Sequence, residues 1–286
     1  NLFTIMNRGG AETMVMNYYR KINREKVQFD FLVHREEEGA YEQEIKELGG
    51  RIYRMPPMYP QNFSLYKKKI REFFEEHKEY KIIHSHMSEL GYFAVRICHA
   101  HSAPHEFDLK MLMRIYFKNR MLPYLTHMFT CGKEAGNYLY GKKNEDKFIQ
   151  LNNAIETKKY RYDKKIDEQV RRELGLEKKF IVGHVGNLRK PKNHKFLINV
   201  FDKIYEKQNN AVLVLAGSGE LETALRQQVK ELGLDDQVLF LGLREDIQRI
   251  MQCFDVFVFP SLFEGLPVTM IEAQASGNLS FISDRI

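Results

Sequence analysis

Two glutamates eight residues apart, Glu264 and Glu272, have the type and spacing to bind hydroxyl groups. The apolar run Val256–Phe259 predicts a buried strand, and the residues after it predict a loop that leads into a helix opening near Pro267. Glu264 should then lie at the carboxyl edge of a sheet, with Glu272 about two turns into the helix. Carboxylate oxygens accept hydrogen bonds from neighbouring hydroxyls, so the pair suits a sugar. On spacing alone, a loop glutamate and a helix-surface glutamate are the plainer alternative.

Gly9 and Gly10 form a second candidate site, which suits a phosphate. They follow the strand expected at the start of the chain and precede the helical pattern of residues 14–21. Because glycine has no Cβ, backbone N–H groups and a helix N-terminus can approach an anion closely there. A purely structural turn is the alternative. The position after the first strand favours binding of a diphosphate.

A cation-rich loop follows the predicted strand Phe180–Val185. It contains Arg189, Lys190 and Lys192, whose charges can neutralise a diphosphate. A solvated basic loop is the alternative. The strand that precedes the loop favours the phosphate interpretation, because ligands of parallel sheets bind where strands end.

Four histidines occur in two pairs, His84 with His86 and His99 with His101, each at or just beyond a predicted strand. Residues two apart on a strand point to the same side, so a metal site is conceivable. No cysteine or carboxylate accompanies them at ligand spacing, and we therefore expect no metal there. His84 and His86 are candidates for supporting or acceptor-side residues, with a merely structural role as the alternative.

Apolar strand-like runs alternate with helical patterns along the chain, which is typical of parallel sheets built from βαβ units. We expect two Rossmann-like α/β domains, residues 1–156 and 157–286, with their boundary in a charged stretch and ligands in a cleft between the sheets. The chain begins and ends within strand-like runs, so we expect both ends to be truncated. The predicted strands are 29–33, 81–84, 127–130, 180–185, 211–216, 238–241 and 256–259, and the clearest helices are 65–77 and 220–232.

Composition narrows the class of protein. With 286 residues, of which 43% are hydrophobic, the chain can form two compact domains. Cys98, Cys131 and Cys253 are widely spaced, which argues against a disulfide framework and favours a reducing, cytoplasmic compartment. No apolar run approaches the roughly 18 residues that span a bilayer. The net charge of +6 lacks the dense basic stripe of a nucleic-acid binder.

Residues 108–122 combine basic and apolar positions. Lys110, Arg114 and Lys118 recur at every fourth residue, and large apolar side chains fill the positions between them. Such a helix can lie on the anionic inner face of a membrane, or it can complete the hydrophobic core of the protein. We treat peripheral membrane contact as a hypothesis, because it would suit an acceptor linked to a lipid.

The block Glu264–Ala273 resembles the E-x7-E motif of glycosyltransferase family 4. Segments at 9–12, 217–220 and 241–242 and the histidine pairs resemble the same family in the same order, so the resemblance covers essentially the whole chain. It implies a GT-B fold, in which two doubly wound domains face a cleft. It also implies a hexosyltransferase-type enzyme that retains the anomeric configuration of a nucleoside-diphosphate sugar, with a UDP-sugar favoured as donor.

The resemblance also implies roles for the residues of this block. Glu264 would contact the donor sugar, and Glu272 would hold the ribose hydroxyls. Gly265, Leu266 and Pro267 would complete the loop around the donor. The other implied donor residues are Gly9, Gly10, Gly217, Asn187 and Lys192.

The diphosphate clamp departs from the family pattern at one position. The family has an arginine five residues before Lys192, where this chain has Asn187, so Arg189 or Lys190 would have to replace that cation. His101 resembles the loop histidine beside the reacting carbon of the sugar. The chain contains no D-x-D pair, and we therefore expect no cofactor and no metal on the diphosphate.

The resemblance implies a saccharide or lipid-linked acceptor in the assembly of a cell-surface polysaccharide. Two alternatives remain open at this point. A non-catalytic module that binds sugar nucleotides is favoured by Asn187, and opposed by the presence of both glutamates. A sugar-nucleotide epimerase of the GT-B fold is opposed by the E-x7-E block.

Overall fold

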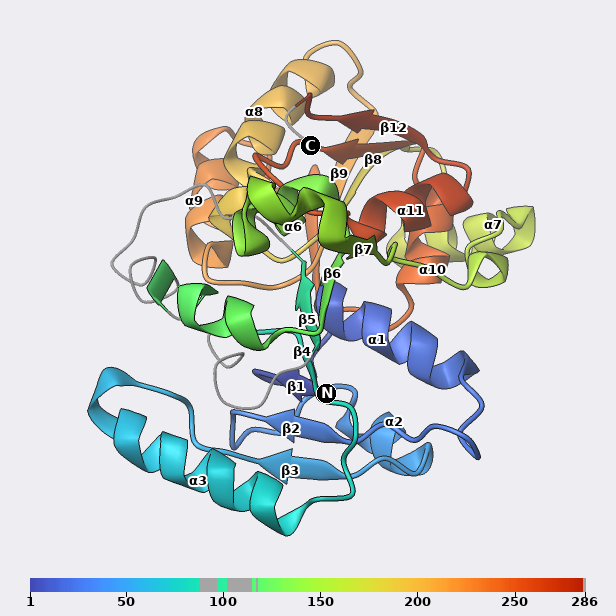
Figure 1. Cartoon of the computed structure of the whole chain (residues 1–286). Helices are drawn as coiled ribbons and strands as arrows, with labels where there is room; N and C mark the ends of the chain where they lie inside the picture. The colour runs from blue at the N-terminus through green and yellow to red at the C-terminus, as the bar shows by residue number, and fades with distance from the viewer. Residues whose placement is uncertain (88–96, 102–114, 117, 285–286) are drawn as a thin grey trace. The chain divides into compact units, whose positions relative to one another are not determined.

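The computed structural model describes residues 1–87, 97–101, 115–116 and 118–284, and the chain divides into two compact units, Asn1–Ala154 and Ile155–Ile286 (Figure 1). Each unit is a parallel β-sheet with helices packed against it, as the alternating pattern predicts. Of the stretch proposed for membrane contact, residues 108–114 and Phe117 lie outside the described residues.

The described strands of the N-terminal unit form one parallel sheet in the order β3-β2-β1-β4-β5-β6-β7. In β1, Leu2 pairs with Leu32 of β2 on one side and with Ser85 of β4 on the other. The winding direction reverses between β1 and β4, which makes this gap the switch point of a doubly wound sheet. The strands are β1 (Leu2–Phe3), β2 (Phe31–Val33), β3 (Ile52–Arg54), β4 (His84–Ser85), β5 (Ile97–Ala100), β6 (His127–Thr130) and β7 (Phe148–Gln150).

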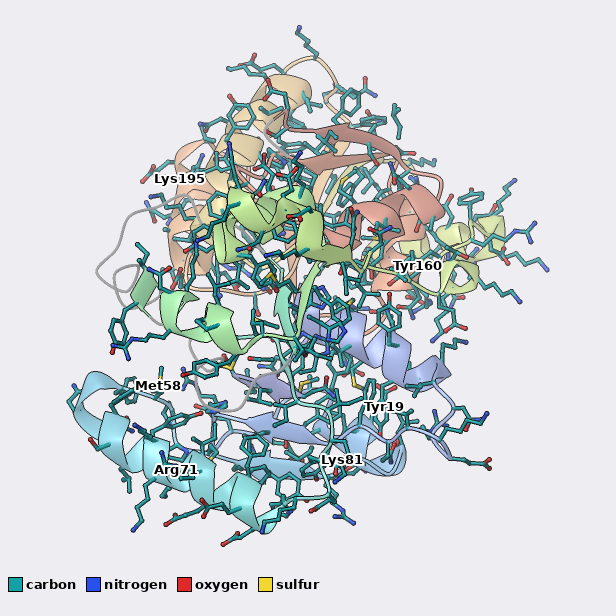
Figure 2. All side chains as sticks on the ribbon, viewed as in Figure 1. Tyr19, Met58, Arg71, Lys81, Tyr160 and Lys195 are labelled. Atoms are coloured by element: carbon teal, nitrogen blue, oxygen red, sulfur yellow. The ribbon has the colours of Figure 1, made fainter. Side chains whose placement is uncertain are left out.

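Helix α1 packs on this sheet through one apolar face. Met14, Met16 and Tyr19 are fully buried against Phe31 of β2, and the Tyr19 side chain is labelled in Figure 2. Helix α3 also packs on this sheet through one apolar face, and its residues belong to a separate apolar cluster. The helices are α1 (Gly10–Lys21), α2 (Glu42–Glu47), α3 (Phe63–Glu76) and α6 (Lys133–Tyr140), with short 3₁₀ turns at Pro60–Asn62, Leu122–Tyr124 and Lys142–Lys147.

The described strands of the C-terminal unit form a parallel sheet in the order β10-β9-β8-β11-β12. Every residue of the interior strand β9 is buried, which explains its uninterrupted apolar sequence. The winding direction reverses between β8 and β11, so this sheet also has a switch point. The strands are β8 (Phe180–Val185), β9 (Ala211–Ala216), β10 (Val238–Gly242), β11 (Val256–Phe259) and β12 (Leu279–Ile282).

Helices cover both faces of this second sheet. Helices α8 and α9 contribute to one apolar cluster, and α7, α10 and α11 contribute to the other. Helix α7 has clear end signals: the Asp163 carboxylate caps its first turn by accepting from the Lys165 backbone N–H at 2.8 Å, and Gly175 ends it in the left-handed conformation. The helices are α7 (Lys164–Leu174), α8 (His194–Tyr205), α9 (Glu222–Glu231), α10 (Ile247–Ile250) and α11 (Val268–Ala275), with 3₁₀ turns at Thr157–Lys159, Lys190–Lys192 and Met251–Cys253.

Four of the predicted strands are confirmed to the residue. The predicted strands 127–130, 180–185, 211–216 and 256–259 have the observed bounds, whereas the run predicted at 81–84 forms a strand only at His84–Ser85. The structure adds β3, β5 and β7, which contain arginine, histidine or glutamine. Their polar residues hid them from a search for apolar runs.

Candidate functional site

Lys192 and Glu264 meet at the switch point of the C-terminal sheet. Lys192 lies in the loop after β8, and Glu264 lies in the loop after β11, which is the neighbouring strand. Lys192 Nζ donates to Glu264 Oε1 at 2.6 Å, and the two side chains are only 19% and 17% exposed. Lys192 Nζ also lies 4.7 Å from the centre of the Phe259 ring. The carboxyl edge of this sheet therefore holds one shielded cation and one shielded carboxylate side by side.

This arrangement can serve a ligand that carries both phosphate and hydroxyl groups. An ammonium group binds phosphate oxygens as a point charge, and a carboxylate accepts hydrogen bonds from hydroxyls. In this structure the two groups satisfy each other, so a ligand must replace their mutual hydrogen bond with its own. Shielding from water strengthens every such contact.

Close backbone packing holds the neighbouring loops in place. Gly217, at the end of β9, has φ of +144°, and its N–H donates to Gly242 O at 2.8 Å. A Cβ at Gly217 would collide with the carbonyl oxygen of Gly186, at the start of the Lys192 loop. The same loop is tied to the one after β9 by a hydrogen bond from Leu188 N to Ser218 O at 3.0 Å. Only glycine fits at Gly217, and this packing fixes the path of the loop that carries Lys192.

Glu272 lies about one turn into α11, not two, because the helix begins at Val268 with Pro267 as its N-cap. Gly265, Leu266 and Pro267 thus remain in the loop that follows Glu264. The Tyr160 hydroxyl donates to Glu272 Oε1 at 2.5 Å, and burial raises the pKa of this carboxyl although the tyrosine bond opposes the rise. The Tyr160 side chain is labelled in Figure 2. Sequence reasoning missed Tyr160, since a contact across 112 residues leaves no local signal.

The departure at Asn187 places an exposed side chain where the family pattern has a cation, and the Arg189 side chain is exposed as well. Below this loop two buried imidazoles contact each other: the rings of His184 and His194 lie 4.7 Å apart at an angle of 84°. Burial lowers the pKa of His184 to about 3 and that of His194 to about 4, so both rings are neutral at physiological pH. Lys192 is therefore the shielded cation of this loop, and neutral groups lie beneath it.

In the N-terminal unit, Gly9 is the N-cap of α1 and Gly10 is its first residue. A Cβ at Gly9 would collide with the carboxylate of Glu12, which folds back over the start of the helix. Burial raises the pKa of Glu12 to about 7. A helix N-terminus attracts negative charge, so the Glu12 carboxylate lies at the position that an incoming anion would also favour.

His101 ends the segment after β5 at the carboxyl edge of the same unit. Its Nε2 lies 2.8 Å from Nδ1 of His86, and its carbonyl oxygen accepts from Cys131 Sγ at 3.3 Å. The His86 ring stacks on Phe3 of β1 with centres 4.3 Å apart. Burial holds the pKa of both histidines well below the ordinary value, so both rings are neutral, and their mutual bond leaves the pair one outward acceptor nitrogen.

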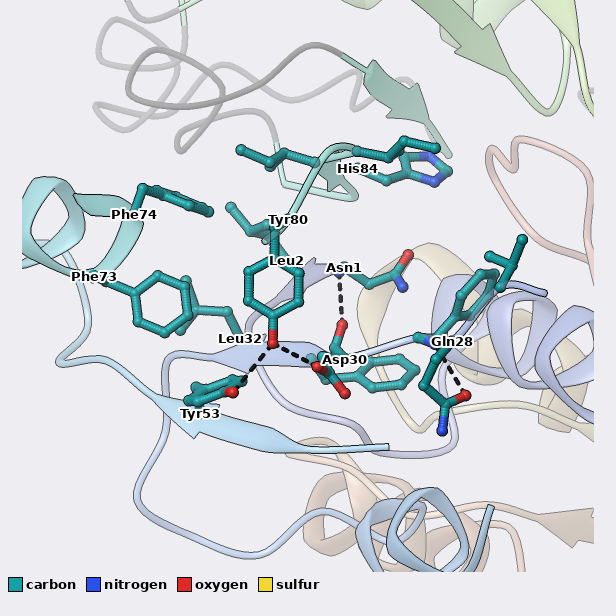
Figure 3. Close-up of a pocket in the computed structure, with 15 residues that line it drawn as sticks. Asn1, Leu2, Gln28, Asp30, Leu32, Tyr53, Phe73, Phe74, Tyr80 and His84 are labelled. Atoms are coloured by element: carbon teal, nitrogen blue, oxygen red, sulfur yellow. Dashed lines mark hydrogen bonds between the residues drawn. The ribbon is translucent and has the colours of Figure 1, made fainter. Parts of the chain in front are cut away.

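An apolar pocket of about 140 Å³ lies at the opposite, amino edge of the N-terminal sheet (Figure 3). The Tyr80 hydroxyl closes one side, donating to Asp30 Oδ2 at 2.5 Å and lying 3.1 Å from the Tyr53 hydroxyl. The amino group of Asn1 donates to Asp30 O at 2.8 Å. Ligands of parallel sheets bind at the carboxyl edge, so this pocket is not the candidate donor site.

The glycosyl transferases group 1 family model matches residues 135–285, which is more than half of the chain and includes Lys192, Glu264 and Glu272. EpsF of Bacillus subtilis (strain 168), whose name places it among the glycosyltransferases, is 37% identical over 297 residues, covering 98% of this chain and 77% of EpsF. This chain belongs to the glycosyl transferases group 1 family.

Other members and structures agree with that assignment. The Escherichia coli UDP-Gal:alpha-D-GlcNAc-diphosphoundecaprenol alpha-1,3-galactosyltransferase is 29% identical over 245 residues, covering 77% of this chain and 60% of the relative. Anabaena HepE in complex with UDP-glucose superposes with a TM-score of 0.82 at 20% identity, over 99% of this chain and 79% of HepE. WaaG, a glycosyltransferase involved in lipopolysaccharide biosynthesis, gives 0.76 at 13% identity over 98% and 78%. The group 1 glycosyltransferase thus has the GT-B fold that the family resemblance implied.

Two further observations concern the helices and the cysteines of this glycosyltransferase. Within the described ranges, no helix is both long and apolar enough to cross a membrane. Cys98, Cys131 and Cys253 are all buried, and none of them forms a disulfide within the part of the chain that the structure describes.

Proposed function

We propose that this glycosyltransferase is a retaining enzyme of family 4 that moves a hexose from a UDP-sugar to a saccharide or lipid-linked acceptor. The observation that carries the proposal is the Lys192–Glu264 pair at the switch point of the C-terminal sheet. A shielded cation and a shielded carboxylate at that edge match the two ends of a sugar diphosphate. The names of the relatives support the choice of substrates, since one uses UDP-galactose and a diphosphoundecaprenol-linked acceptor.

Each residue then has a defined task. Lys192 neutralises the diphosphate, Glu264 binds hydroxyls of the transferred sugar, and Glu272 binds the ribose hydroxyls. Gly217 keeps the loop backbone close enough for its N–H groups to reach the phosphates, and the other glycine loop, Gly9–Gly10, does the same on the N-terminal unit.

His101 is the candidate acceptor of a hydrogen bond from the sugar near its reacting carbon. Its ring is neutral, and its bond to His86 fixes the orientation of the imidazole. A neutral ring can accept a hydrogen bond, whereas a charged imidazolium could only donate. The departing diphosphate would take the acceptor's proton, so the proposal requires no protein nucleophile.

The acceptor side of the proposal draws on residues 108–122 as a peripheral contact with an anionic membrane at the cytoplasmic face. The charge pattern Lys110, Arg114 and Lys118 supports it. An acceptor whose lipid lies in that membrane would then be close to the enzyme.

Thermal shift with UDP-, GDP- and ADP-sugars tests the donor, and release of UDP in the presence of a polyprenyl-diphosphate-linked sugar tests the transfer. Ligand at about a hundred times its dissociation constant should stabilise the protein by about 2.7 kcal/mol. We expect the response from UDP-sugars. If no nucleotide sugar raises the melting temperature, the donor assignment is wrong. Where transfer is observed, NMR of the product distinguishes retention of the anomeric configuration from inversion.

A further inference from the structure

Four histidines project from one face of two neighbouring strands in the N-terminal unit. The register pairs His84 with Ile97 and Ser85 with Cys98, so that His86 and His99 come next to each other. Alternate residues on a strand share a face, which puts His101 on that face too. The ring centres are 4.1 Å apart for His84 and His86, and 5.6 Å apart for His84 and His99.

Three of these residues can direct one nitrogen each at a common point. Ligand atoms of His84, His86 and His99 all lie within 4.8 Å of one another. His99 is only 2% exposed. Its two ring nitrogens and Nε2 of His84 are buried, and each is without a hydrogen-bond partner among the residues described. Buried polar atoms in proteins are nearly always bonded, and one ion would supply a partner to Nε2 of His84 and to one of the two His99 nitrogens.

We propose that His84, His86 and His99 bind one transition-metal ion of the Zn²⁺ class on the shared face of strands β4 and β5. The site goes beyond the proposed transfer reaction and does not rest on it, because the donor diphosphate is assigned to other residues. With the ion on His86 Nε2, His86 Nδ1 donates to His101 Nε2 and the proton of His101 is on Nδ1, so the acceptor role of His101 belongs to the ion-free protein.

The chemistry of the ligands selects the ion. Imidazole nitrogen suits Zn²⁺, Ni²⁺ and Cu²⁺, whereas Mg²⁺ and Ca²⁺ need oxygen ligands that this cluster lacks. Three protein ligands leave one position of a tetrahedral ion open for water or an anion. Because all three imidazoles are neutral ligands, the full charge of the ion remains, and an anion in the fourth position would offset it.

The surroundings of His86 also support a role as a ligand. Nε2 of His86 lies 3.4 Å from Asn1 Oδ1, a long contact that the ion would replace, while Nδ1 of the same ring stays bonded to His101 Nε2 at 2.8 Å. A partner on the far nitrogen is the usual support of a metal-binding histidine.

The test is a titration of the chelator-treated full chain with ZnCl₂ by isothermal calorimetry, repeated with Co²⁺ while its visible absorption is followed. We expect one ion per chain and the intense visible bands of four-coordinate Co²⁺. His84→Gln and His99→Gln should each weaken Zn²⁺ binding by about tenfold to a hundredfold or more. His127→Ala is the matched control, because His127 lies exposed on the neighbouring strand β6 outside the cluster; it should bind as the wild type does.

X-ray absorption at the zinc edge of the wild-type protein keeps the test independent of whether the variants fold. Three imidazole ligands in that spectrum support the proposal. Absence of stoichiometric binding, equal binding by the His84→Gln and wild-type proteins, or a spectrum dominated by oxygen ligands would each overturn it. UDP binding, measured alongside, reports on the C-terminal unit, so a failed metal site and a failed donor site give different results.

Discussion

Replacing Glu264 with glutamine should slow sugar transfer and leave UDP binding intact or tighter. In the structure Glu264 holds Lys192, the cation assigned to the diphosphate. UDP must loosen this ion pair in order to bind, so weakening the pair removes a competitor for Lys192. The transferred sugar, by contrast, loses the acceptor of its hydroxyl hydrogen bonds.

The magnitude follows from the geometry. Two unit charges about 3 Å apart attract by about 5 kcal/mol at an effective dielectric constant of about 20, and desolvation offsets much of this. The net value of a hydrogen bond to a charged group is about 1.5 to 3 kcal/mol, which corresponds to about tenfold to a hundredfold. We expect turnover to fall by that factor. Glutamine still accepts a bond from Lys192, so any gain in UDP affinity should stay below about tenfold.

The assay measures the UDP dissociation constant by calorimetry and the release of UDP from UDP-glucose for each protein. Glu272→Gln should show the reverse pattern, a weaker affinity for UDP, because that carboxyl is assigned to the ribose. Glu231→Gln is the matched control, since this glutamate is exposed near the end of α9. If Glu264→Gln and Glu272→Gln both behave like Glu231→Gln, the two carboxylates are ordinary surface residues and the reasoning fails.

Three other predictions concern the metal, the N-terminal glycine loop and the C-terminal one. Turnover of UDP-glucose should persist in EDTA, because the sequence has no D-x-D pair to hold a metal on the diphosphate; loss with chelator and recovery with Mg²⁺ would contradict this. Burial raises the pKa of Glu12 from 4.5 to about 7, so the folded state binds this proton more tightly than the unfolded state, and the carboxyl costs stability as the pH rises through that range. Glu12→Gln should therefore gain up to about 3 kcal/mol in the free energy of unfolding at pH 8 over wild type and nothing at pH 4, as measured in urea, whereas a gain independent of pH would refute the cause. Gly217→Val should reduce UDP affinity by at least about tenfold, because its side chain collides with the Gly186 carbonyl and the backbone is strained; calorimetric affinity equal to that of the wild type would show that the loop adapts.

Much of the fold could be predicted because buried parallel strands are wholly apolar. β9 and β11 are such strands, and their bounds were predicted correctly. β5 could not be found in this way, since two of its four residues are polar or sulfur-containing and it reads Ile-Cys-His-Ala. A short interior strand in which cysteine and histidine replace large apolar residues gives a weaker apolar signal than β9 or β11.

The candidate site could likewise be predicted only in part. The meeting of Lys192 with Glu264 across 72 residues follows from topology, because loops after adjacent strands at a switch point are neighbours. The hydrogen bond from Tyr160 to Glu272 does not follow from the strand order, and the sequence alone does not predict it. The depth of Glu272 in α11 was overestimated because Gly265–Pro267 stays in the loop, where Pro267 is the N-cap.

Binding of the donor diphosphate at the carboxyl edge of the C-terminal sheet is tested by a calorimetric titration of UDP into the wild-type chain and into Lys192→Met. Methionine keeps much of the side-chain volume and removes the charge. The wild type should bind one UDP per chain, and Lys192→Met should bind at least about tenfold more weakly, which is the loss of one hydrogen bond to a charged group. Equal affinity in the two proteins, or no binding by the wild type, would contradict the account.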